Sequence, residues 1–137
     1  MHRACCTFCA FVIFIASAGC GDRGPTYVPV TGTVKFSDGT VPKGKIASIN
    51  FQPVAGSPDT KAASGTITAD GSFTLTTVQP GDGARPGEYV ATVTVKDAYP
   101  VGKSLVAEPF TNPGNSPLKA TVTEDGENHF DFVVERP

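Results

Sequence analysis

The chain has 137 residues and a mass of 14.2 kDa, with 39% hydrophobic and 18% charged residues. This size and composition fit one globular domain and exclude two large ones. The 15 glycines and 12 prolines make up about 20% of the chain, which predicts many turns but no low-complexity segment. The formal net charge of −2 comes with no run of basic residues, so we expect no nucleic-acid partner.

The first 19 residues have the three parts of a secretory signal peptide. A cationic start with Arg3 is followed by an apolar run over residues 8–15 and by small residues at positions 16–19. The apolar run is shorter than the ~20 residues that a membrane-spanning helix needs. We therefore expect residues 1–19 to direct export and then to be removed.

Residues 17–20, with the sequence SAGC, resemble the lipobox of bacterial lipoproteins. In that family the cysteine thiol is diacylated and the chain is then cut before it. The resemblance implies that Cys20 becomes the first mature residue and that its lipid holds the protein on an extracytoplasmic membrane face. Ser17 departs from the pattern, which most often has Leu at this position.

A second cleavage site is open, because residues 16–18 also fit the general signal peptidase. A cut after Ala18 would give a soluble secreted protein. The remaining cysteines, Cys5, Cys6 and Cys9, precede both cuts. We therefore expect neither a metal site nor a bound cofactor in the mature chain to depend on them.

Residues 20–27 are polar and contain a Gly-Pro pair, which predicts a short lipidated tether before a domain over residues 28–137. In that domain apolar and polar residues alternate with period 2. The alternation predicts seven strands, over residues 30–36, 46–52, 63–69, 72–78, 89–96, 118–123 and 129–134. Seven short, half-buried strands are typical of an all-β fold, here a seven-stranded antiparallel β-sandwich with immunoglobulin-like proportions.

Two Asp-Gly pairs lie between neighbouring predicted strands, at residues 70–71 and 125–126. Such pairs readily adopt the positive φ angles of a tight hairpin, so both are expected to set strand register. A calcium site would instead need six or more converging oxygens, and the DxDxDG spacing is missing.

Five segments carry a resemblance to carboxypeptidase regulatory-like domains, which have a transthyretin-like sandwich. The opening segments are VTGTV at residues 30–34, DGTVPKG at 38–44 and FQP at 51–53. TADGSFTL at 68–75 resembles the central hairpin of that family, and PGEYVATV at 86–93 its following strand. Together with the lipobox, the resemblance implies a small bacterial envelope lipoprotein with a noncatalytic module, and it transfers no active-site residue.

The mature chain offers little catalytic chemistry, so we expect no enzyme. His129 is the only histidine after the signal, and no GxSxG elbow is present for a serine nucleophile. A carboxylate-based glycan hydrolase stays open as an alternative, because the carboxylate separation is a tertiary property. A small-ligand carrier is a further alternative, with a pocket lined by Tyr99 and Phe110 as the discriminating feature.

The connection over residues 97–116 is long for a compact domain, and such loops are often functional. Tyr99 and Phe110 could contact an envelope protein or a polysaccharide. The alternative is that the apolar side chains of the segment cover an open edge of the sandwich and prevent strand addition. Those side chains are Val101, Leu105, Val106 and Phe110.

Overall fold

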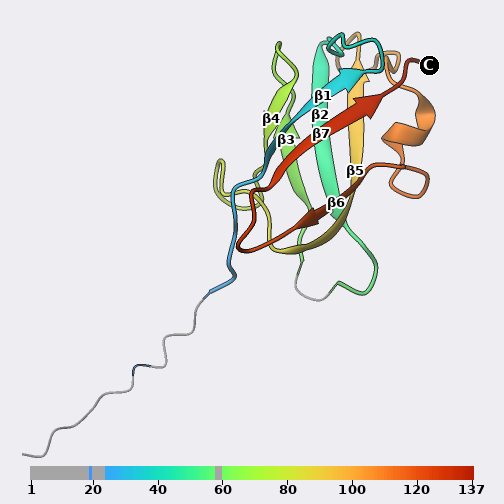
Figure 1. The fold of residues 1–137 in the computed structure, drawn as a ribbon. Coiled ribbons are helices and arrows are strands. Elements are labelled where there is room, and N and C mark those ends of the chain that lie inside the picture. The colour runs from blue at the N-terminus through green and yellow to red at the C-terminus, as the bar shows by residue number, and fades with distance from the viewer. Residues whose placement is uncertain (1–18, 20–23, 58–59) are drawn as a thin grey trace, which may run out of the picture.

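The computed structural model describes residues 19, 24–57 and 60–137, and it contains seven strands and one short 3-10 helix (Figure 1). The strands are β1 (Thr31–Phe36), β2 (Ile46–Pro53), β3 (Ala63–Thr66), β4 (Ser72–Thr74), β5 (Gly87–Lys96), β6 (Lys119–Val122) and β7 (His129–Val134), and the helix is η1 (Glu108–Thr111). Each strand falls within or beside a range that the alternation predicts, so the all-β fold is confirmed. Cys20 and the expected signal peptide up to Ala18 lie outside the described residues.

The strands form two sheets, with orders β4-β1-β7 and β3-β2-β5-β6. All pairs are antiparallel except β1 with β7, which run parallel from Thr31 beside His129 to Phe36 beside Val134. The β-sandwich is confirmed, but the expectation of a wholly antiparallel one is wrong for this pair. The cause is the direction of β6, which runs antiparallel to β5 and finishes at the end of the sandwich where β1 begins, so β7 starts beside the start of β1 and runs in the same direction.

The two ends of the sandwich hold different parts of the chain, and we call them the entry end and the far end (Figure 1). At the entry end, residues 24–27 lead into the domain, and Val28 makes the first backbone bridge, with Ala84. Tyr27 lies just before it, with the Arg85 guanidinium 5.5 Å from its ring centroid. The far end holds the close of β1, the start of β2 and the close of β5, because Ile46 pairs with Lys96.

The turns explain why two strands are shorter than predicted. The chain passes from one sheet to the other between β3 and β4, so these strands form no ladder with each other, and Ser64 of β3 makes only an isolated bridge, with Thr76 just after β4. Asp70-Gly71 forms the predicted turn, with Gly71 at a φ of 87°. The prediction for Asp125-Gly126 is wrong, because Gly126 does not adopt the left-handed conformation that Gly71 has.

An aromatic cluster centred on Phe51 joins the two sheets. This β2 side chain is fully buried, and its ring centroid lies 5.9 Å from that of Phe130, 6.0 Å from that of Phe132 and 6.3 Å from that of Phe73. Those three rings come from the opposite sheet, while Tyr89 of β5 packs at 5.8 Å from the same side. Edge-to-face and tilted ring pairs at these distances add stabilisation beyond the apolar area that they bury.

Gly32 gives this cluster its room. It lies in the central strand β1, between Phe73 of β4 and Phe130 of β7. A Cβ atom there would lie 2.0 Å from the Phe130 carbonyl oxygen and 2.6 Å from the Phe73 ring. The close packing of three strands under the aromatic rings therefore requires the absence of a side chain at position 32.

Residues 97–116 cover an edge of the sandwich, as one of the two sequence interpretations predicts. The Leu105 N–H donates to the Val95 carbonyl at 2.8 Å, and the Ala107 N–H donates to the Glu135 carbonyl at 2.8 Å. The segment thus continues the edge of β5 beyond β6 and reaches the end of β7. Val106 is buried at 1% exposure, whereas Val101 is 86% exposed, so the covering role expected of Val101 is wrong.

The C-terminal residues are fastened to the far end. Arg136 Nη1 donates to Asp38 Oδ2 at 2.8 Å, and its guanidinium lies 4.1 Å from the ring centroid of Phe36. Hydrogen bonds from Thr40, followed by the one from Arg136, lower the pKa of Asp38 to about 2. In the parts of the chain that the structure describes, no helix is long and apolar enough to cross a membrane.

Truncation of the central ring tests the cluster. We expect Phe51→Ala to lower the free energy of unfolding by about 3–5 kcal/mol, because it leaves a cavity between the sheets. The exposed Val133→Ala change on β7 is the control and should cost less than about 0.5 kcal/mol. Urea denaturation of both variants measures the difference, and equal costs would contradict a core centred on Phe51.

Candidate functional site

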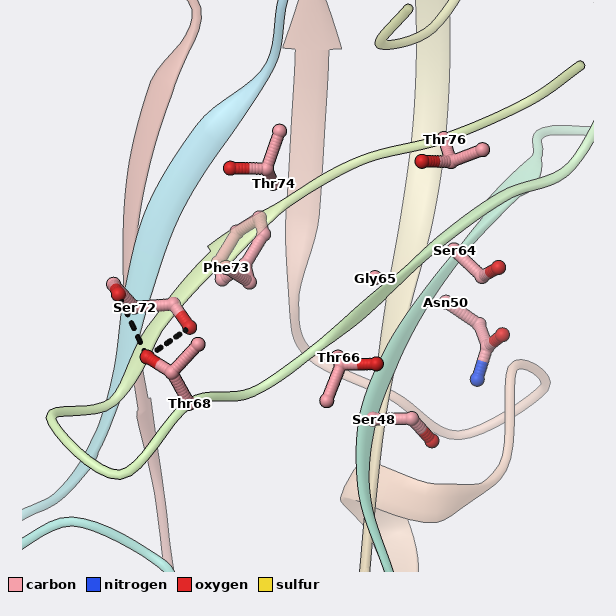
Figure 2. A pocket seen from close by; sticks show the side chains of 10 residues that line it. All are labelled: Ser48, Asn50, Ser64, Gly65, Thr66, Thr68, Ser72, Phe73, Thr74 and Thr76. Carbon is pink, nitrogen blue, oxygen red and sulfur yellow. Dashed lines mark hydrogen bonds between the residues drawn. The ribbon is translucent and has the colours of Figure 1, made fainter. Parts of the chain in front are cut away.

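A hollow of about 540 Å³ lies on the surface where the outer sides of β2 and β3 meet β4 (Figure 2). Seven of its ten lining residues carry hydroxyl groups and one carries an amide. We call it the hydroxyl groove; its residues are Ser48, Asn50, Ser64, Gly65, Thr66, Thr68, Ser72, Phe73, Thr74 and Thr76. Neither Tyr99 nor Phe110 is among them.

Strand periodicity places four of these side chains on one face. Ser48 and Asn50 alternate on β2 with the buried Ile49 and Phe51, so they point away from the core. Strand register sets Thr66 opposite Ser48 and Ser64 opposite Asn50. Figure 2 shows the four side chains projecting to the same side of the two strands.

Gly65 lies where β3 and the chain after the hairpin pack closely beneath the groove. The Ser64 N–H donates to the Thr76 carbonyl at 3.0 Å, and the Thr76 N–H donates back at 2.8 Å. A Cβ atom on Gly65 would lie 2.5 Å from the Thr74 carbonyl oxygen. The strand after the hairpin can therefore approach β3 only because position 65 has no side chain.

The two ends of the groove are occupied by internal hydrogen bonds. At one end the Thr68 and Ser72 hydroxyls lie 2.8 Å apart, and both donate to the Asp70 carboxylate. At the other end Thr76 Oγ1 accepts from the Gly81 N–H at 2.9 Å. These bonds fix the turns that bound the groove.

The middle of the groove differs from its ends. Among the residues that the structure describes, none forms a hydrogen bond with the side chains of a central set of five. That set is Ser48, Asn50, Ser64, Thr66 and Thr74. The groove therefore presents hydroxyl and amide groups whose donors and acceptors are open to solvent or to a ligand.

Asp70 is the carboxylate nearest to this site in the chain, and it is committed to its own turn. The Thr68 hydroxyl, the Ser72 hydroxyl and the Ser72 N–H all donate to it, in that order of effect, and they lower the pKa of Asp70 well below its usual range. No residue that lines the groove is itself charged. The groove is thus suited to binding by neutral hydrogen bonds and has no general acid or base of its own.

The residues expected to contact a partner are not brought together. Tyr99 is 80% exposed in a tip over residues 97–103, which is closed by the Lys103 N–H donating to Asp97 Oδ1 at 2.8 Å. Phe110 is half-buried in η1 and packs against the core. The tip extends from β5 at the far end, so Tyr99 remains a candidate contact, whereas Phe110 serves the packing of the domain.

His129 lies in a row of polar side chains across β1 and β7. Its Nδ1 is 3.0 Å from Thr31 Oγ1, and its Nε2 is 3.1 Å from Asp131 Oδ1. A hydroxyl, an imidazole and a carboxylate in this order have the connectivity of a catalytic relay. The row is exposed, however, with 47% of the His129 and 70% of the Asp131 side chain accessible, which gives little exclusion of water.

Asp131 owes its altered ionisation to a neighbour on β1. The Thr33 hydroxyl donates to Asp131 Oδ1 at 2.7 Å, and this bond, with a smaller effect from His129, lowers the pKa of that carboxyl. Thr33 and Asp131 are register partners on the parallel strands β1 and β7, so their hydrogen bond links the two strands. The row therefore has a sufficient explanation in stabilising the β1–β7 pair.

None of the carboxylates that the structure describes lines the groove. Glu124, Asp125 and Glu127 are exposed on the connection between β6 and β7. Within residues 24–57 and 60–137, no group of three or more His, Cys, Asp or Glu side chains is placed to hold a metal ion.

Comparison with known proteins adds no relative. No protein family, curated protein or solved structure matches the chain.

The turn beside the groove makes a pH-dependent contribution to stability. Because the folded pKa of Asp70 is depressed, its stabilising effect is present above the unfolded pKa of about 4 and is lost as the pH falls toward the folded value. We expect Asp70→Asn to lower the thermal midpoint at pH 6 and to flatten the fall in midpoint below pH 4. Asp125→Asn, in an exposed connection, is the control; an identical change in both pH profiles would contradict the assignment.

Proposed function

We propose that the protein is an exported lipoprotein whose sandwich acts as a noncatalytic module in the cell envelope, with a binding or structural role. In this proposal residues 1–19 are removed as a signal peptide and Cys20 carries the lipid. Residues 20–27 form the tether, and residues 28–137 form a domain related to the transthyretin-like carboxypeptidase regulatory-like family. The chemistry of residues 17–20 and the all-β architecture support this proposal.

The observation that carries the proposal is the geometry of the two ends (Figure 1). Residues 24–26 are exposed and lead away from the entry end, while the tip with Tyr99 lies at the far end. A lipid on Cys20 would therefore hold the entry end toward the membrane and present the far end to the envelope. The tether residues need not contribute to the core, because the first buried side chain in the described domain is Val28.

Acylation would supply a strong anchor without a membrane-spanning segment. Each buried CH₂ group of a lipid contributes about 0.8 kcal/mol, and two or more chains bind a membrane far more stably than one. The protein partner or polysaccharide would then be met by surfaces of the sandwich that face away from the lipid. The tip around Tyr99 is one such surface, since exposed aromatic side chains on braced loops are frequent contact residues.

The anchor can be tested by substitution at the acylated position. We expect Cys20→Ala to shift the protein from the membrane to the soluble fraction and to abolish incorporation of radiolabelled palmitate. Cys9→Ala is the matched control, because that cysteine precedes the cleavage site and should leave both measurements unchanged. Membrane retention of the Cys20→Ala protein would contradict lipid anchoring, and a soluble wild-type protein that starts at Gly19 would favour secretion.

A further inference from the structure

The geometry points to the hydroxyl groove as a binding site for a segment of an uncharged polysaccharide. This inference deepens the proposed function by naming a ligand class, and it rests on that function only for the location where the ligand is met. Three properties of the groove carry it: its unpartnered hydrogen-bonding side chains, its lack of charge and the way in which its neighbouring strand edge is occupied.

The groove gathers side chains without a hydrogen-bond partner among the described residues in one hollow, whereas several other hydroxyls of the domain are already bonded. On β1, the Thr31 and Thr33 hydroxyls are paired with His129 and Asp131. Ser104 and Ser116 bond to backbone carbonyls in the covering segment. The central groove side chains have no such partner among the described residues, although they lie together in one hollow.

The arrangement of these groups suits a ligand that is rich in hydroxyls. Each serine or threonine hydroxyl can both donate and accept, and the Asn50 amide offers two donors and an acceptor in one plane. Directly opposite residues in a sheet are about 5 Å apart, and alternate residues of one strand are about 7 Å apart. Ser48, Asn50, Ser64 and Thr66 therefore form a fixed grid that can address the repeated hydroxyls of neighbouring sugar units.

The absence of charged residues from the groove disfavours ionic ligands. None of its lining residues is ionisable, and the nearby Asp70 carboxylate is already saturated by three hydrogen bonds from its own turn. An anionic polymer would lose hydration in the groove without gaining a cation to pair with. A neutral polymer exchanges hydrogen bonds with water for hydrogen bonds with the protein hydroxyls, and its desolvation costs much less free energy.

An extended peptide is the competing ligand, and the strand edge disfavours it. Peptides that add to a sheet need a row of free backbone N–H and C=O groups. Beside the groove, the β3 edge is bridged by Ser64 and Thr76 and approached closely by the Thr74 carbonyl. Recognition here depends on side chains, which favours a polysaccharide over a peptide strand.

The groove lacks an exposed aromatic ring, and this sets the expected strength of binding. Phe73 lines it but is only 2% exposed, so no flat face is available for a sugar ring to stack on. We expect a dissociation constant of about 1 mM for a single groove, which is typical of a few solvent-exposed hydrogen bonds. Many anchored copies on one membrane would raise the overall affinity for a repeating polymer by a factor of about 10² to 10⁴.

Affinity electrophoresis of the full-length protein tests the inference directly. The protein is extracted in a detergent without a sugar headgroup and run in native gels that contain dextran, mannan or hydroxyethylcellulose, all uncharged, or alginate, which is anionic. We expect retardation by at least one neutral polymer and none by alginate. Asn50→Ala with Ser64→Ala should weaken that retardation by a factor of about 4 to 100, since each lost hydrogen bond is worth about two- to tenfold.

Two control variants make the result specific to the groove. Gln52→Ala changes an exposed side chain on the same face of β2, and Thr121→Ala removes an exposed hydroxyl on β6; neither residue lines the groove. Both should leave retardation unchanged, and the urea midpoint of every variant verifies folding. The inference is overturned if no neutral polymer retards the protein, if alginate alone does so, if the controls lose binding equally, or if a Gly/Ser-rich peptide binds the groove instead.

Failure of this inference is distinguishable from failure of the anchor. Soluble Cys20→Ala protein that is still retarded by a neutral polymer would support the groove, while native Cys20 chains found in the soluble fraction would refute the lipid attachment alone. A membrane-held, palmitate-labelled protein that ignores every neutral polymer would refute the groove and leave the anchor in place.

Discussion

The contact between Phe51 and the rings of Phe73, Phe130 and Phe132 is the interaction on which the rest of the structure depends. It places one β2 side chain against both outer strands of the opposite sheet. Once Phe51 points inward, the period of the strand sends Ser48 and Asn50 outward, where they form the hydroxyl groove. The candidate site is therefore a direct consequence of the way in which the core is filled.

Short segments of chain cover the exposed edges of the sheets. β6 covers only the first part of β5, and near the close of β5 the Leu105 N–H donates to the Val95 carbonyl, so the segment after β5 covers that part of the edge. On the other side, the bridge between Ser64 and Thr76 closes the space where the β3–β4 hairpin changes sheets. Edges that are covered in this way cannot easily recruit strands from other molecules, and the surfaces left free are polar faces and loop tips.

Much of the fold could be predicted from the sequence, because alternation reports which side chains face the core. The seven strands and nearly all inward positions, such as Val93 and Val134, follow from period 2 alone. Alternation does not report which strands are neighbours, so it could reveal neither the parallel β1–β7 pair nor the sheet to which each strand belongs. The need for glycine at position 32 arises from Phe73 and Phe130, both distant in sequence, and no local pattern reveals it.

The site was missed for a related reason. Ser48, Asn50, Ser64 and Thr66 all lie within the predicted strands, but outward hydroxyls are ordinary on β-sheets and only register brings these four together. The sequence instead drew attention to Tyr99 and Phe110, because aromatic residues in a long loop stand out. Their different environments, one exposed and one packed on the core, depend on contacts that no local pattern encodes.

The parallel pairing of β1 with β7 also affects the order in which the parts of the fold can form. The central strand of the smaller sheet lacks one neighbour until residues 129–134, almost the last of the chain, have arrived. Contacts between the two termini of a chain carry a large loop-closure cost and form late. The N-terminal portion of the described domain therefore cannot complete the sandwich before residues 129–134 join it.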